Sequence, residues 1–313
     1  MLRRMTCFLL ISVFAVPAEV AAQAQEATAS GATVSMVVTV ESRHGMNPPA
    51  IDAADVLVYE EKSRDKVTSW VPAKGDHAQL EFYILIDDAS GVSIGTQFDD
   101  LRQFINAQPE TTKIGIGYMQ NGTVQVAQSP TADHAQAAKA LRLPLGVAGI
   151  NGSPYFSLSD LAKHWSPDGV RHEALMVSDG IDRYYDAADT QDPYLSAAIE
   201  DAQKAGIMVY TIYNPGVGHA GHSYWRNYWG QIYLSQLSDE TGGEAYYVGF
   251  SGPAVAFSPY LDDINHRFNN QYLLSFIAKP QKKAGMRRVK LMSEIPNIDL
   301  VGQDRVYVPA SSQ

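Results

Sequence analysis

The sequence predicts an α/β protein: a doubly wound, mostly parallel sheet with a small β module formed by the N- and C-terminal segments. Between positions 79 and 268, apolar runs of strand length alternate with helical patterns. Such alternation is typical of a parallel sheet covered by helices on both faces. On either side of this region the chain has short β-branched runs separated by turn residues. The length of 313 residues is enough for about two domains.

Residues 1–24 are predicted to be an export signal. Arg3 and Arg4 form a basic start, Cys7 to Val16 is an apolar run, and Val20-Ala21-Ala22 or Ala22-Gln23-Ala24 offers small residues for cleavage. A retained anchor helix is disfavoured because the run is too short to cross a bilayer. Removal of the segment leaves no cysteine, which excludes disulfides and thiol catalysis. We expect an exported bacterial protein, periplasmic or extracellular.

Residues 30–76 are predicted to be an N-terminal β segment, with strands at 34–40, 56–59 and 67–71. Residues 270–313 are predicted to be a C-terminal β segment, with strands at 272–277, 289–292 and 306–308. Neither segment has enough strand to be stable alone, because an isolated hairpin is marginal in water. We therefore expect the two ends of the chain to pair with each other.

The central region, 79–268, is predicted to contain the strands and helices of the parallel sheet. Strands are expected at 82–86, 114–118, 123–126, 174–177, 207–213 and 245–249, and Asn121-Gly122 favours a two-residue hairpin turn. Helices are expected at 98–105, 131–141, 156–165 and 193–205, in a segment that ends at Thr241, and from Ser258 to Phe268. Asp133 or Thr131 is expected to cap the second of these. The helix at 193–205 has the clearest limits, because Asp192 is a good N-cap and Gly206 is a good C-terminal stop.

The net charge is −10 at neutral pH. Nucleic-acid binding is therefore not expected, because it depends on Lys and Arg that neutralise phosphates. No membrane span is expected once the signal is removed. The sequence also lacks a G-x-S-x-G elbow, a phosphate-binding Walker A loop and a dinucleotide-binding glycine turn.

Polar residues that prefer hard cations follow several predicted strands. Asp87-Asp88-Ala89-Ser90 follows the first central strand, Ser153 precedes a helix, and Asp179-Gly180 follows the strand at 174–177. Ligands of open parallel sheets bind beyond the carboxyl ends of the strands. Carboxylate and hydroxyl oxygens suit Mg²⁺ or a similar ion. The alternative is that these residues only cap helices and turns.

In this pattern the sequence resembles the von Willebrand factor A (vWA) domain, a Rossmann-like fold. The family's metal-ion-dependent adhesion site has a D-x-S-x-S motif, a Thr in a Gly-rich loop, and an Asp in a D-G pair. Asp88 and Ser90 match the first two positions, Ser153 stands where the Thr would be, and Asp179-Gly180 matches the last. The resemblance covers 79–268, and the flanking β segments look like those of bacterial exported vWA-related proteins.

The resemblance implies Mg²⁺ or Mn²⁺ held by Asp88, Ser90, Ser153 and Asp179. Val92 stands at the third position of the motif and offers no side-chain oxygen. Either Ser93 replaces it through a one-residue shift or the site has one ligand fewer, and Asp87 is a further candidate ligand.

The segment from His219 to Trp229 follows the strand at 207–213 and is expected at the same edge of the sheet. Tyr224, Trp225 and Trp229 are of the type that dominates binding hot spots, and core packing is the alternative for them. His219 and His222 are close enough to share a transition metal, but no third ligand is near, so a polar loop is favoured.

The leading functional hypothesis is a non-enzymatic, exported protein-binding module for adhesion or envelope assembly. The resemblance implies that an ion on the module would capture a carboxylate of a protein partner. A metal-assisted hydrolase is one alternative, although no general base is placed for it. A structural vWA scaffold whose metal site has decayed is the other, and Val92 is its best support.

Overall fold

The computed structural model describes residues 31–43, 47–147, 149, 151–166, 169–185, 191–215, 223–246 and 256–310. The predicted export signal, His219 and His222 lie outside these residues. Among the helices that are described, none is long and apolar enough to cross a membrane.

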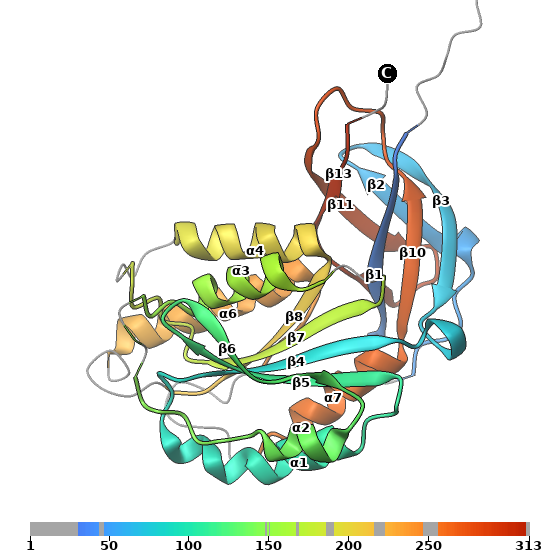
Figure 1. Cartoon of the computed structure of the whole chain (residues 1–313). Coiled ribbons are helices and arrows are strands. Elements are labelled where there is room, and N and C mark those ends of the chain that lie inside the picture. Colours follow the sequence, from blue (N-terminus) through green and yellow to red (C-terminus); the bar gives the residue numbers. More distant parts are fainter. Residues whose placement is uncertain are drawn as a thin grey trace, which may run out of the picture.

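The predicted doubly wound, mostly parallel sheet is confirmed (Figure 1). Its strands are β4 (Leu80–Asp87), β5 (Thr112–Gln120), β6 (Thr123–Thr131), β7 (Arg171–Ser178), β8 (Ile207–Tyr213) and β9 (Ala245–Tyr246). They lie in the order β6-β5-β4-β7-β8-β9. All their pairings are parallel except that of β5 with β6. The chain therefore builds the sheet from β4 first in one direction, through β5 and β6, and then in the other, through β7, β8 and β9. The order reverses between β4 and β7.

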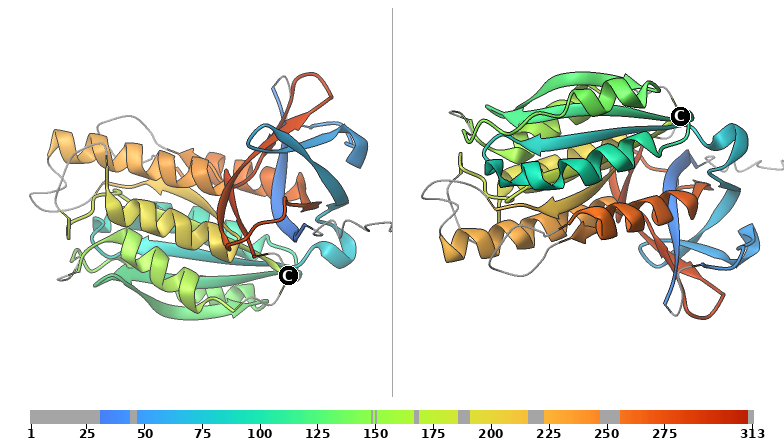
Figure 2. Two further views of the ribbon diagram at one scale, coloured as in Figure 1. Left: turned by 90° about the horizontal axis from the view of Figure 1, so that it is seen from above. Right: turned by 90° about the horizontal axis from the view of Figure 1, so that it is seen from below.

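Helices cover both faces of this sheet, as the views from above and below show (Figure 2). Successive strand residues alternate between the two cores: Ile84 packs with the helices of one face, and Leu85 with those of the other. The first face carries α1 (Phe98–Asn106), α2 (His134–Lys139) and α7 (Ser258–Asn269). The second carries α3 (Pro154–His164), α4 (Pro193–Ala205) and α6 (Tyr224–Thr241).

Helix α4 has the limits that its sequence predicts. The Asp192 side chain accepts hydrogen bonds from the backbone N–H groups of Tyr194 and Leu195, at 2.8 and 3.1 Å. Pro193 occupies the first turn, where its missing N–H costs nothing. Gly206 ends the helix in the left-handed conformation, with φ of 69°.

The hairpin at Asn121-Gly122 is also confirmed, with both residues at positive φ. Its second strand is longer than predicted, because β6 pairs with β5 as far as Thr131. The helix expected at 131–141 is therefore shorter, from His134 to Lys139, and of its two candidate caps Asp133 is the one observed. Asp133 caps the shorter α2, accepting from the backbone N–H of Gln136 at 2.9 Å.

The two ends of the chain form one antiparallel sheet, as predicted. It has the order β12-β1-β10-β3-β2-β11-β13. Its strands are β1 (Thr33–Ser42), β2 (Val56–Glu60), β3 (Ser63–Pro72), β10 (Gln271–Ile277), β11 (Gly285–Ser293), β12 (Ile298–Val301) and β13 (Arg305–Val308). The pattern did not predict β12, which is only four residues long. Three short 3₁₀ helices complete the described elements: η1 (Ala53–Asp55), η2 (Gly75–His77) and η3 (Val92–Gln97).

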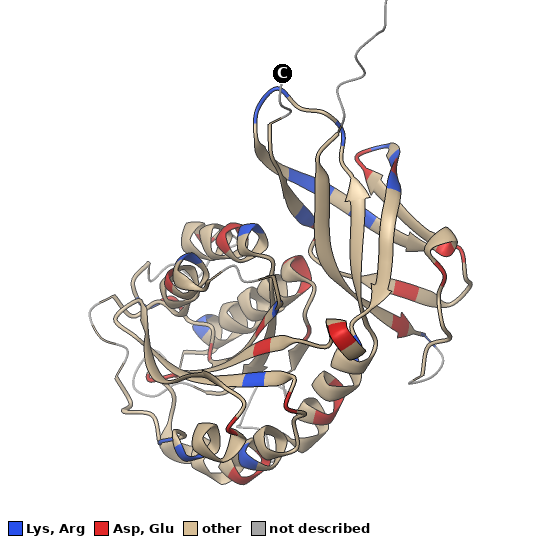
Figure 3. Ribbon diagram, turned by 45° about the vertical axis from the view of Figure 1, so that its right-hand side comes forward, with Lys and Arg blue, Asp and Glu red and all other residues tan. Residues whose placement is uncertain are grey.

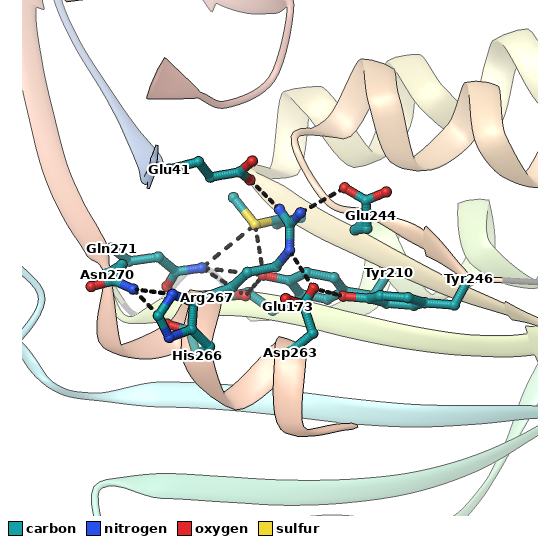
Figure 4. A network of polar contacts seen from close by, with 11 residues as sticks. Glu41, Glu173, Tyr210, Glu244, Tyr246, Asp263, His266, Arg267, Asn270 and Gln271 are labelled. Carbon is teal, nitrogen blue, oxygen red and sulfur yellow. Dashed lines mark hydrogen bonds and ion pairs between the residues drawn. The ribbon is translucent and has the colours of Figure 1, made fainter. Parts of the chain in front are cut away.

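A buried polar network joins the terminal sheet to the central sheet (Figure 4). Gln271, the first residue of β10, donates to Glu173 of β7 at 3.1 Å and receives a bond from Arg171. Tyr210 of β8 donates to the same Glu173 carboxylate at 3.1 Å. Burial raises the pKa of Glu173 above its usual value. These contacts fix the N-terminal end of β7, and so the position of its carboxyl end.

Charge is unevenly distributed over the molecule (Figure 3). On the terminal sheet, Tyr59 of β2 pairs with Arg64 on one side and Lys290 on the other, and both cations are exposed. Arg288 of β11 pairs with Arg305 of β13, and these are exposed too. The terminal sheet thus has a basic outer side in a chain that is acidic as a whole.

Candidate site at the carboxyl edge of the central sheet

The carboxyl ends of β4 and β7 lie side by side where the strand order reverses. From β4 the chain passes to α1 on one face, and from β7 to α4 on the other. Such a reversal opens a crevice between the two connections. Asp87 and Asp88 stand at the end of β4, and Ser178 and Asp179 at the end of β7. We use the name carboxyl edge for this end of the central sheet and its loops.

Asp87 is the carboxylate of β4 that faces β7. It is buried, and it accepts hydrogen bonds from Ser178 Oγ at 2.7 Å and from the backbone N–H of Ala89 at 2.8 Å. Burial and the nearby negative charge of Asp179 raise the pKa of Asp87 to about 6. Asp87 therefore occupies the place beside Asp179 that the vWA resemblance assigns to Asp88.

Asp88 is held by Arg142 instead. Its fully buried carboxylate accepts from Arg142 Nη1 at 2.7 Å and Nη2 at 2.8 Å, one bond to each oxygen. The Arg142 guanidinium also lies 3.6 Å from the ring centre of Tyr118, a cation–π contact. The backbone N–H of Leu145 donates to Asp88 Oδ1 at 3.2 Å. Both oxygens of Asp88 are thus committed within the chain.

Asp179 is paired in the same way with Arg183. Arg183 Nη1 donates to Asp179 Oδ1 at 3.1 Å, and Nη2 donates to Oδ2. Asp179 also accepts from the backbone N–H of Ile181 at 2.9 Å. The carboxylate is buried, and the Arg183 side chain is only 15% exposed.

Ser153 belongs to the same edge, and its hydroxyl is also committed. Ser153 Oγ donates to Asp182 Oδ2 at 2.9 Å and accepts from the backbone N–H of Phe156 at 3.4 Å, which caps α3. The other Asp182 oxygen accepts from the backbone N–H groups of Tyr184 and Tyr185, at 2.8 and 3.0 Å.

The remaining predicted ligands, Ser90 and Ser93, have different surroundings. Ser90 is buried, and its Oγ has no hydrogen-bond partner in the structure. Val92 is 62% exposed, at the first turn of η3. Ser93 is exposed on the same turn, and its carbonyl accepts from Thr96 Oγ1 at 2.9 Å.

The residues present do not fit a divalent ion in this arrangement. The carboxylates of Asp88 and Asp179 are each held at both oxygens by a guanidinium, and Ser153 is bonded to Asp182. Of the four residues that the resemblance assigns to the ion, Asp88, Ser90, Ser153 and Asp179, only Ser90 has a side chain without a hydrogen-bond partner in the structure. In the described part of the chain, no group of three or more carboxylate, imidazole or thiol side chains is placed to hold a metal. Mg²⁺ or Mn²⁺ stays a prediction from the resemblance.

The hollows of the molecule are mostly elsewhere. A cavity lined by Asp87, Ser153 and Ser157 has a volume of about 10 Å³, room for about one water. Larger hollows of about 440 and 470 Å³ lie along α6 and between the two sheets. Small-molecule sites are usually several hundred Å³, so the cavity beside Asp87 lies far below that range.

The predicted partner-binding aromatics lie on α6, so the segment from Tyr224 onward is helical and not part of a loop. Tyr224 and Trp225 are 62% and 65% exposed. Trp229 is half-buried and stacks on Tyr233, with ring centres 6.0 Å apart. Trp229 therefore packs against the core, whereas Tyr224 and Trp225 present large surfaces at the carboxyl edge.

Several solved structures are similar to this chain at low sequence identity. An aerotolerance-related membrane protein from Bacteroides fragilis is 15% identical, with 61% of this chain and 98% of that one covered and a TM-score of 0.41. A von Willebrand factor type A protein from Catenulispora acidiphila is 10% identical, with 90% and 75% covered and a TM-score of 0.45.

The vWF domain of the type V pili tip protein Mfa5 from Porphyromonas gingivalis is 12% identical, with 60% of this chain and 95% of that one covered and a TM-score of 0.41. No family model and no curated protein matches the chain. The solved structures similar to this chain thus include vWA domains, the family that its sequence resembles.

Sequence reasoning did not find Arg142, Arg183 or Asp182. One signal was available for Arg183, because it follows Asp179 by four positions in the short segment after β7. Arg142 gave no such signal, since it lies 54 positions from Asp88.

Proposed function

We propose that this chain is a non-enzymatic protein-binding module whose binding surface is the carboxyl edge of the central sheet. The distribution of exposed apolar side chains carries this proposal. Most of the large ones in the described residues lie at that edge. They are Val92, Leu143, Leu145, Val147, Tyr184, Tyr185, Tyr224 and Trp225.

Single exposed apolar residues are normal on a protein surface, but a group at one end of a fold is not. The backbone N–H of Leu145 donates to the Asp88 carboxylate at 3.2 Å, and the backbone N–H of Val147 donates to the Asp88 backbone carbonyl at 2.8 Å. Tyr184 and Tyr185 are held by the bonds that their backbone N–H groups make to Asp182. The carboxylates of the crevice therefore fix the loops that expose these side chains.

Arg142 adds a charged group to the same surface. Its side chain is 40% exposed, next to Leu143 and opposite the buried Asp88. Exposed aromatic side chains and arginine are the residue types enriched in binding hot spots. The small volume of the cavity beside Asp87 also favours recognition of a surface over turnover of a substrate.

We further propose that the protein is exported, to the periplasm or beyond the cell. The basic start, apolar run and small residues of positions 1–24 support this, as does the absence of cysteine after them. Sequencing the N-terminus of the protein recovered from a periplasmic fraction tests the proposal. A chain that retains Met1 and stays with the cytoplasm would contradict it.

The binding surface is tested by site-specific photo-crosslinking in the source cells. A photoreactive amino acid replaces Trp225 of α6 in one variant and Tyr307 of β13 in the other, because both positions are exposed but lie on different parts of the molecule, at the carboxyl edge and on the terminal sheet. We expect a discrete protein adduct, identified by mass spectrometry, at position 225 and not at position 307. Once that partner has been purified, the double variant Y224A/W225A should compete poorly with the original chain for binding to it.

M292A/Y307A is the matched control, because it also removes two exposed apolar side chains. Thermal unfolding of both double variants confirms that they are folded. Equal competition by the two variants, or adducts at both crosslinking positions, would contradict a binding surface at the carboxyl edge.

A further inference from the structure

Arg183 joins two loops at the carboxyl edge, the one after β7 and the one before α3. Its guanidinium holds Asp179, directly after β7, and its backbone N–H donates to the carbonyl of Gly152, before α3, at 3.0 Å. Nη1 also donates to the carbonyl of Ile181 at 3.3 Å. Arg183 therefore connects segments that are otherwise distant in the sequence.

Three buried carboxylates surround this one cation. Asp179 is in direct contact, and the negative charges of Asp87 and Asp182 are near enough to act on the Arg183 guanidinium through space. Buried charges need compensation, because removing them from water costs several kcal/mol for each ion. Arg183 supplies that compensation at the end of β7.

Arg142 does the same at the end of β4. It neutralises the fully buried Asp88 through two short bonds, and its backbone N–H and carbonyl both bond to the Tyr118 hydroxyl of β5. Each aspartate that the vWA resemblance assigns to an ion thus has its own arginine. The Arg142–Asp88 pair and the Arg183–Asp179 pair lie in different loops, so each depends on its own residues in the sequence.

We infer that Arg183 and Arg142 are the resident cations of the carboxyl edge, and that these guanidinium groups take the place of a divalent ion. A divalent ion at Asp179 would have to displace a guanidinium that is already bidentate and mostly buried, or lie beside it at repulsive distance. The edge is therefore fully assembled without Mg²⁺ or Mn²⁺. This inference is independent of the proposed function, because it concerns charge compensation and not a partner.

Removing Arg183 should leave the negative charges of Asp179, Asp87 and Asp182 without the cation on which all three act. Carboxylate oxygens suit a hard divalent ion, and without Arg183 an ion can approach Asp179 where the guanidinium now lies. The substitution R183M keeps a long side chain but removes the charge. We therefore expect R183M to be unstable without ions and to gain an affinity for Mn²⁺ that the original chain lacks.

The test measures thermal unfolding of the full chain in EDTA and in millimolar MgCl₂ or MnCl₂, together with Mn²⁺ binding by electron paramagnetic resonance. The original chain should show the same Tm in all three solutions and bind no Mn²⁺ stoichiometrically. R183M should unfold on the order of 10 °C lower in EDTA. Its Tm should recover partly with Mn²⁺, or with the second substitution D179N, because both remove uncompensated negative charge.

R102M is the matched control, since Arg102 pairs with Asp99 in an exposed contact on α1. It should change neither Tm nor Mn²⁺ binding. If R183M does not fold, R183K keeps the charge without the bidentate geometry and should fall between R183M and the original chain. An ion-dependent Tm in the original chain would overturn the inference. So would an R183M variant as stable as the original, or one that neither Mn²⁺ nor D179N restores.

Discussion

Arg267 of α7 donates to the carboxylate of Glu41 in β1, and this contact joins the two sheets of the molecule (Figure 4). The same guanidinium binds Glu244 at 2.6 Å and Asp263 at 3.0 Å, although its side chain is only 9% exposed. One buried cation thus holds three carboxylates, one of which belongs to the terminal sheet.

We expect R267Q to destabilise the chain by about 1–2 kcal/mol, because three carboxylates lose their shared cation but are each partly exposed and keep part of their hydration. Urea unfolding gives the free energy, and amide exchange should show the loss of protection first in β1. R288Q is the control, since the Arg288 side chain is 79% exposed and 3.7 Å from Asp304. It should change stability by less than about 0.5 kcal/mol. Equal losses in the two variants would contradict a joining role for Arg267.

Gly180 and Gly206 share a backbone conformation, with φ of 70° and 69°, but differ in their surroundings. A Cβ on Gly180 would lie 2.2 Å from the carbonyl oxygen of Gly230 in α6, whereas a Cβ on Gly206 would meet nothing within 4 Å. G206A should therefore cost only about 1–2 kcal/mol, the left-handed strain of a residue other than glycine.

G180A must also displace α6, so its loss should exceed that of G206A by about 2 kcal/mol or more. Guanidinium chloride unfolding of both variants measures the difference. Equal losses would mean that α6 can move away from the loop after β7 without strain.

The titration of Asp87 should make the chain less stable as pH rises. Its pKa is about 6 in the folded state, against an ordinary value of 3.8. Protonation therefore favours the folded chain. The contribution is complete below about pH 4 and is lost as pH rises to about 6, on the order of 3 kcal/mol in total.

D87N has no such titration, so its stability relative to the original chain should increase between about pH 4 and 7. Urea midpoints at several pH values test this. Asp299 provides a control of opposite sign, because Arg43 lowers its pKa. A D87N stability difference that stays constant with pH would show that Asp87 is ionised in the folded chain throughout.

The last strand of the terminal sheet offers a neighbouring pair of test positions. Val306 is buried in the terminal core, and Tyr307 beside it is 45% exposed. V306A should destabilise the chain by about 1–2 kcal/mol through lost burial and the cavity left behind. Y307A should cost less than about 0.5 kcal/mol. Thermal unfolding of both variants checks the expected order, and the reverse order would contradict the register of β13 with β11.

Much of this fold could be predicted because its signals are local. The caps at Asp192 and Gly206 and the turn at Asn121-Gly122 act within a few residues, so the sequence alone marks them. The end of β6 could not be predicted in this way. Its length depends on pairing with β5, and that long-range pairing overrides the helical pattern that starts at Thr131.

The location of the site could be predicted from the sequence, but the side chains that neutralise its aspartates could not. Acidic residues after parallel strands must meet at one edge of a sheet, so Asp87 and Asp179 could be placed there from the sequence. Which side chain neutralises each of them depends on distant loops. Arg142 reaches Asp88 across 54 positions, and no periodic pattern encodes such a contact.

The pairing of both chain ends in one sheet also has a consequence during synthesis. Ser35 of β1 meets Ser275 of β10, 240 positions later. At roughly 5–20 residues per second, a ribosome needs on the order of ten seconds or more to supply that partner. Through this interval β1 has no β10 to pair with, and the terminal sheet cannot form. The proposed export would therefore act on a chain whose terminal sheet is still unformed during most of its synthesis.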